Sequence, residues 1–198
     1  MKSLTKKLIF SVLSLFLATG VVNAATWTIP LPDHIGPLSS GDITETFASP
    51  ISGTGTLSFD LLGYLTLDGA NNGYDDTFTL SVNGTPILSG LFALGGGGEN
   101  QINFIPTGSS VDTTNTFPGI ITSTGGDVKF ILPLVLIAGL NSITFDYGQL
   151  QAIGDEAWGY KDAVVTITQT PIPAAIWLFS SAVISMLGIS KRLKQASA

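Results

Sequence analysis

Two turn-like stretches of the sequence are rich in carboxylate and amide side chains. The first runs from residue 68 to residue 76, where Gly69 and Gly73 let the backbone bend sharply, and the second spans residues 154–159. Ca²⁺ prefers about six to eight oxygen ligands in a flexible geometry. We therefore predict a Ca²⁺ site here, with the alternative that these side chains only cap turns and keep the surface soluble. The candidate ligands are Asp68, Asn71, Asp75, Asp76, Asp155 and Glu156.

Aromatic residues beside the second turn are candidates for stacking against a sugar ring. Trp158 and Tyr160 lie closest to the acidic pair in the sequence. An aromatic ring offers a flat apolar face to a ligand, but aromatic residues of a β-sandwich more often belong to its core. Both interpretations stay open from the sequence alone.

The residue types that catalysis needs do not form a recognisable set. His34 is the only histidine, so a histidine-based zinc cluster is excluded and a Ser-His-Asp triad has little support. Asp155 and Glu156 are adjacent and would point to opposite faces of an extended strand, whereas glycoside hydrolysis needs two facing carboxylates. We therefore predict no catalytic residues and no enzyme activity.

Charge is distributed unevenly along the chain. All 14 acidic residues lie between Asp33 and Asp162, whereas only Lys129 and Lys161 among the eight basic residues lie between residues 25 and 169. Two positive groups against 14 negative ones give that stretch a formal charge of −12. Such a field repels phosphate backbones, so we predict no binding to nucleic acid. The chain has no cysteine, which excludes disulfides and thiolate metal sites.

Residues 25–169 alternate apolar and polar side chains in the manner of β-strands. The pattern is clear at 57–67, 78–82 and 85–94, and Asn83-Gly84 predicts a type I′ hairpin turn. Residues 95–98, all glycine, indicate a flexible turn or close backbone packing. About eight strands without helices predict an all-β domain, an antiparallel β-sandwich of the jelly-roll type, with an immunoglobulin-like sandwich as the alternative. The remaining predicted strands are 101–105, 128–136, 142–147 and 163–168, with a long surface loop at 106–126.

The first 24 residues have the three parts of a secretory signal peptide. Lys2, Lys6 and Lys7 precede an apolar run, which ends in the small-residue sequence Val22-Asn23-Ala24. The alternative, an ordinary amphipathic helix, fits the absence of acidic residues less well. We predict a signal helix over residues 1–24 that directs the chain to the general export machinery.

The last segment, residues 170–198, combines a proline-rich motif, an apolar stretch and a basic end. Pro171, Ile172, Pro173 and Ala174 form the motif, residues 174–190 are apolar, and Lys191 and Arg192 open the basic end at 191–194. The apolar stretch just reaches the lower end of lengths that span a bilayer, while Lys and Arg stay with the cytoplasmic headgroups. We predict a transmembrane helix that holds a precursor transiently in the inner membrane.

This three-part tail resembles the PEP-CTERM class of bacterial sorting signals in its VPLPA-type variant. The motif Val-Pro-Leu-Pro-Ala reads here as residues 170–174, with Thr170 in place of the usual Val. The resemblance implies that an exosortase recognises the motif, removes the helix and passes the protein to the cell surface or extracellular matrix of a Gram-negative bacterium that makes exopolysaccharide.

The core also resembles secreted bacterial jelly-roll domains of a lectin-like or adhesive kind. The residues that carry this resemblance are the stretches 67–69, 74–84 and 155–160, in which Asp-rich turns lead into strands. It implies a jelly-roll fold, often with structural calcium. Together, these features predict an exported, non-catalytic surface or matrix protein with an adhesive or structural role. The alternatives are a calcium-assisted carbohydrate-binding module and, third, a glycan hydrolase.

Overall fold

The computed structural model describes residues 24–169, which form eleven β-strands and no helix. The predicted signal helix and the predicted sorting segment lie outside these residues. No helix that could span a membrane occurs within the described part of the chain. The strands are β1 (Thr26–Pro30), β2 (His34–Leu38), β3 (Gly41–Ser49), β4 (Gly53–Leu65), β5 (Thr77–Val82), β6 (Thr85–Leu91), β7 (Gln101–Phe104), β8 (Ser110–Asn115), β9 (Gly126–Leu136), β10 (Gly139–Tyr147) and β11 (Glu156–Thr168).

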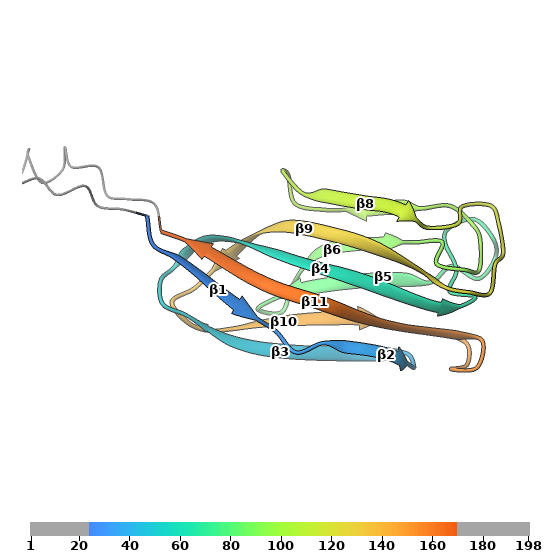
Figure 1. Ribbon diagram of the computed structural model, residues 1–198, viewed down its shortest axis with the longest axis horizontal. Coiled ribbons are helices and arrows are strands. Elements are labelled where there is room, and N and C mark those ends of the chain that lie inside the picture. Colours follow the sequence, from blue (N-terminus) through green and yellow to red (C-terminus); the bar gives the residue numbers. More distant parts are fainter. Residues whose placement is uncertain (1–23, 170–198) are drawn as a thin grey trace, which may run out of the picture. The chain divides into compact units, whose positions relative to one another are not determined.

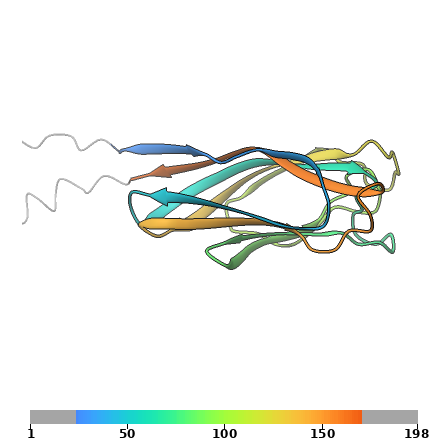
Figure 2. The same ribbon diagram turned by 90° about the horizontal axis from the view of Figure 1, so that it is seen from below.

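The strands form two antiparallel sheets. One has the order β1-β11-β4-β9-β8, with β2 also paired to β11, and the other has the order β3-β10-β5-β6-β7. Figure 1 shows the long strands β4, β9 and β11 running side by side, and Figure 2 shows the sheets as two layers. The all-β class and the antiparallel pairing predicted from the alternating pattern are therefore confirmed.

The space between the sheets is filled by aromatic and aliphatic side chains from both layers. Phe59 of β4 stacks on Phe130 of β9, with ring centroids 4.9 Å apart, and meets Phe145 of β10 edge-on at 5.2 Å. All three are buried in one continuous cluster. Because β10 belongs to the opposite sheet, this cluster makes the domain a β-sandwich.

The predicted hairpin is confirmed, but the predicted number of strands was too low. Asn83 and Gly84 both have positive φ, at 50° and 76°, between β5 and β6. Three strands in residues 26–49 went unpredicted because proline, glycine and charged residues blur their alternation. The loop predicted at 106–126 contains β8, a mostly exposed strand whose sequence carries one apolar residue. Its pairing with β9, rather than a buried face, makes it a strand.

Candidate functional site

The two acidic stretches meet at one end of the sandwich because β4 pairs with β11. In this pairing the last residue of β4, Leu65, lies opposite the first residue of β11, Glu156. The backbone N–H of Thr66 donates to the carbonyl oxygen of Asp155 at 3.0 Å. The Thr66 hydroxyl donates to the Asp155 carbonyl and to its Oδ1, both at 2.9 Å. These bonds join the loop after β4 to the loop before β11.

Glycines 95–98 support the first acidic loop through backbone contact. The N–H of Gly69 donates to the carbonyl of Gly97 at 2.9 Å, and Ala70 and Glu99 exchange two backbone bonds of 2.8 Å. A Cβ atom on Gly96 would lie 2.1 Å from Asp68 Oδ1 and 2.2 Å from the Thr66 carbonyl oxygen. Of the two interpretations of this run, close backbone packing is therefore the correct one.

Three carboxylates come together beneath these loops. Asp68, Asp76 and Glu156 are buried, with 6%, 5% and 1% of their surface exposed. One oxygen from each lies within 4.8 Å of the others. The N–H of Asp68 donates to Asp76 Oδ2 at 2.7 Å, the N–H of Gln151 donates to Glu156 Oε2 at 2.6 Å, and the Asn72 amide donates to Asp68 Oδ1. Each carboxylate is thus held through one of its two oxygens.

Burial of this carboxylate cluster disfavours its ionised state. It raises the pKa of Asp68 to about 6, against the opposing effect of the Asn72 hydrogen bond and with added repulsion from Glu156. Burial likewise raises the pKa of Asp76 to about 7, although the N–H of Asp68 favours the carboxylate. The hydroxyl of Tyr147 is buried nearby, and burial followed by the charge of Asp76 raises its pKa well above the usual value.

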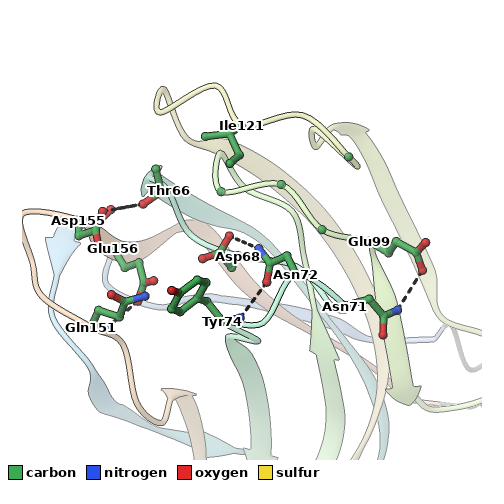
Figure 3. A pocket seen from close by; sticks show the side chains of 14 residues that line it. Thr66, Asp68, Asn71, Asn72, Tyr74, Glu99, Ile121, Gln151, Asp155 and Glu156 are labelled. Carbon is green, nitrogen blue, oxygen red and sulfur yellow. Dashed lines mark hydrogen bonds between the residues drawn. The ribbon is translucent and has the colours of Figure 1, made fainter.

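An open pocket of about 670 Å³ lies above the carboxylate cluster and includes Asp68 and Glu156 in its lining. Figure 3 shows these two side chains with Tyr74 beside them. Tyr74 is 63% exposed, although its backbone N–H is held by Asn72 Oδ1 at 3.0 Å. The pocket therefore offers an aromatic face, amides and carboxylates to a ligand.

The other three predicted metal ligands lie outside the carboxylate cluster. The side-chain amide of Asn71 donates to Glu99 at 3.1 Å, on the far side of the pocket in Figure 3. Asp75 is exposed, because it precedes the buried Asp76 in an extended segment where neighbouring side chains point in opposite directions. Asp155 lines the pocket and accepts the bond from Thr66.

The prediction that Trp158 and Tyr160 stack against a ligand was wrong. Both side chains lie in the core, with 1% and 0% of their surface exposed. The indole N–H of Trp158 donates to the carbonyl of Ser39 at 2.8 Å, and the ring of Tyr160 stacks on Phe145 at 3.9 Å. The two residues are on the same, inward face of β11 because they are two positions apart. Their core role was the alternative that the sequence left open.

Sequence reasoning missed Tyr74, Thr66 and Gln151 as pocket residues. Tyr74 had a usable signal: it lies in a stretch of Asn, Gly and Asp without two-residue alternation, where an aromatic side chain has no core to enter. Gln151 contributes a backbone N–H, which no sequence pattern specifies.

Comparison with known proteins assigns no family. No family model matches the chain, and no curated protein matches it. Among solved structures, an exo-β-1,3-galactanase from Phanerochaete chrysosporium with β-1,3-galactotriose is similar in two crystal structures, at 17% and 19% identity with TM-scores of 0.33 and 0.31. Each match covers 73% of this chain and 27% of the galactanase, so the chain spans about a quarter of that enzyme's length.

A family 35 carbohydrate-binding module from Clostridium thermocellum is also similar. The match has 16% identity and a TM-score of 0.31, and it covers 76% of this chain and 100% of the module. These similarities assign no ligand to this chain.

Proposed function

We propose that this domain is a non-catalytic glycan-binding module, a sandwich of the jelly-roll type, whose binding site is the pocket above the carboxylate cluster. The observation that carries the proposal is the exposed ring of Tyr74 beside amide and carboxylate groups in one open pocket. A sugar ring has an apolar face that packs on an aromatic ring, and its hydroxyls need hydrogen-bond partners around the rim.

The accessibility of Tyr74 on two sides supports this use of its ring. Besides the main pocket, Tyr74 lines a smaller one of about 370 Å³ together with Asp75 and Gln149. A side chain with this exposure keeps its ring surface available to a ligand. Its backbone is fixed by Asn72, so binding does not require ordering of the whole loop.

The geometry of the acidic residues supports binding rather than hydrolysis. In most glycosidases two carboxyl groups flank the scissile bond, about 5–5.5 Å apart in retaining enzymes and about 6.5–9.5 Å apart in inverting ones. Here three carboxylates crowd together, and all three are buried. A sugar in the pocket would lie above this cluster and not between two of its members.

The proposed function also includes export of the chain and its sorting to the cell surface. We propose that the chain is processed by an exosortase and serves as an adhesive component of the cell surface or matrix, where exopolysaccharide is a glycan within reach. The signal-peptide pattern of residues 1–24 and the motif at Pro171 to Ala174 support this part of the proposal.

The test is a glycan array probed with the full-length chain, followed by affinity measurements on the best ligand. Substitution of Tyr74→Ala removes the stacking face, and we expect about a tenfold weaker affinity. Tyr74→Phe should retain most of the affinity because it keeps the ring. A matched control is Phe104→Ala, since Phe104 is 46% exposed on β7 and is not among the residues that line the pocket.

Two results would contradict glycan binding at this site. One is an array without any bound glycan, both in Ca²⁺ and in chelator. The other is a bound glycan whose affinity falls equally in Tyr74→Ala and Phe104→Ala. The non-catalytic part is checked separately, by incubating the bound glycan with the protein and assaying for new reducing ends.

A further inference from the structure

The buried carboxylate cluster carries three acidic groups without a matching positive charge. Four ion pairs occur within residues 24–169, and none of them includes Asp68, Asp76 or Glu156. Both lysines of the described chain contact Asp60 instead, at 3.7 Å. Burying charged groups without a partner is costly, so such a cluster needs either protons or a cation.

One carboxylate oxygen of the cluster is buried without any hydrogen-bond partner. Glu156 Oε1 is buried and has no hydrogen-bond partner, although Oε2 of the same carboxylate accepts from the N–H of Gln151. The hydroxyl of Tyr147 is also buried without a partner. Buried polar atoms are nearly always paired, so an unpaired carboxylate oxygen indicates a missing partner.

We propose that Asp68, Asp76 and Glu156 bind one divalent cation, with a preference for Ca²⁺ over Mg²⁺. The proposal goes beyond glycan binding and does not depend on it. Each carboxylate is oriented through one oxygen and leaves its second oxygen available, as the hydrogen bonds to Asn72, Asp68 and Gln151 show. The open pocket above supplies room for water molecules to complete the coordination shell.

Ligand number and ligand type favour Ca²⁺ among the divalent cations. The three oxygens lie within 4.8 Å of one another, a separation that one Ca²⁺ ion can bridge. Mg²⁺ usually keeps several water ligands and binds through one or two carboxylates, so three converging carboxylates suit Ca²⁺ better. Zinc prefers nitrogen and sulfur ligands, but the chain has no cysteine, and the ring of its single histidine pairs with Glu45 at 2.8 Å.

The decisive experiment uses the full-length chain, purified in mild detergent and stripped of metal on a chelating resin. Calorimetric titration with CaCl₂ should show one site per chain. Ca²⁺ at about 100 times its Kd should raise the melting temperature by about 5–10 °C, because it binds the folded state alone. MgCl₂ should produce a smaller rise. No heat and no melting shift with either ion would overturn the cation site, and an equal or larger response to Mg²⁺ would overturn the preference.

Two amide variants separate ion binding from a structural role of the carboxylates. Asp76→Asn and Glu156→Gln keep a carbonyl oxygen for the N–H donors of Asp68 and Gln151, but remove one negative charge. We expect both variants to lose the Ca²⁺-dependent rise and to melt at or above the wild type when metal is absent. A merely structural carboxylate would instead give a lower melting temperature in both conditions.

Asp75→Asn is the matched control, since its exposed carboxylate neighbours the cluster without belonging to it. It should keep the full Ca²⁺ response, and a response that persists in both amide variants would overturn the proposed site. The outcomes are separable from those of glycan binding. A Ca²⁺ shift without any bound glycan rejects the binding module and leaves the cation site standing, while glycan binding without a Ca²⁺ response does the reverse.

Discussion

At the residue scale, each carboxylate of the cluster accepts a hydrogen bond at only one of its two oxygens. The two oxygens of one side chain therefore have different surroundings. In Glu156 the oxygen bonded to the N–H of Gln151 fixes the direction of the side chain, and the opposite oxygen is buried without a hydrogen-bond partner. Asp76 is likewise oriented through one oxygen, by the N–H of Asp68 at 2.7 Å. Under the cation proposal, one oxygen of each residue would position the side chain and the other would bind the ion.

The raised pKa values predict how the metal-free protein responds to pH. The folded-state pKa values of Asp68 and Asp76, about 6 and about 7, lie above the ordinary value of 3.8, so the folded state binds these protons more tightly than the unfolded state. Their contribution to stability is full below about pH 4 and is lost as the pH rises through 6 and 7. We expect the melting temperature to fall by at least about 5 °C between pH 5 and pH 8.

Thermal melts in metal-free buffer measure this fall, and the Asp76→Asn variant serves as the comparison. The variant lacks the group that titrates near pH 7, so its melting temperature should decline less. An equal decline in both proteins would show that general repulsion among the acidic residues causes it, and a rise toward pH 8 would contradict the prediction outright.

At the residue scale, the sequence indicated which two acidic stretches meet better than which of their side chains come together. Three of the six candidate ligands lie together. The choice among neighbours depends on which side of the backbone each side chain leaves, as Asp75 and Asp76 show. The N–H of Gln151 reaches the site only through folding of a distant segment, which a local pattern does not encode.

At the element scale, the backbone of glycines 95–98 packs directly against the acidic loop and restricts its conformation. Leu67 accepts backbone bonds from both Leu94 and Gly96, at 3.0 Å and 3.1 Å. Gly96 lies so close to Asp68 that a side chain at this position would displace the carboxylate. An element without side chains thereby determines where a charged side chain can lie.

Substitution of Gly96→Ala tests this element. Its Cβ would lie 2.1 Å from Asp68 Oδ1, so we expect a loss of about 1–3 kcal/mol in the free energy of unfolding and a smaller Ca²⁺ response. Urea unfolding measures the first effect and calorimetric titration the second. Gly148→Ala is the control, because a Cβ there meets no atom within 4 Å and should cost less than about 0.5 kcal/mol. Equal losses in the two variants would contradict the packing role.

Elements were predictable where two-residue alternation is strong, as in β4 and β5, whose buried positions follow one another at every second residue. Strands were missed where their sequence lacks alternation and only backbone pairing with a neighbouring strand stabilises them. β8 has one apolar residue, and β2 meets β11 at two pairs with an irregular register. Such strands form because a neighbour offers free backbone groups, which a single segment of sequence does not reveal.

At the scale of the whole molecule, the absence of cysteine excludes disulfides, so the stability of residues 25–169, which carry a formal charge of −12, depends on the buried core. Under the export proposal, the domain would work outside the cell, where calcium-binding modules have Kd values of about 10⁻⁴–10⁻³ M. A cation site that folds the acidic loops fits the proposed destination.

The sorting proposal predicts two different fates for the intact and shortened chains. The intact chain should be recovered from the cell surface or medium with an intact mass below 20.6 kDa, because both ends are removed. A chain that lacks residues 171–198 should be exported without surface attachment. Cell fractionation and mass spectrometry distinguish these fates, and recovery of both chains from the cytoplasm would contradict export.

The pairing of β1 with β11 determines how far the pocket lies from the two ends of the described chain. Thr26 lies opposite Thr168, so the described chain starts and stops at one end of the sandwich, while Glu156 and the pocket lie at the other end of β11. Thirteen residues of extended strand span about 40 Å. An attachment made at Thr26 or Thr168 would therefore hold the pocket about 40 Å away, with the sandwich itself as a rigid spacer.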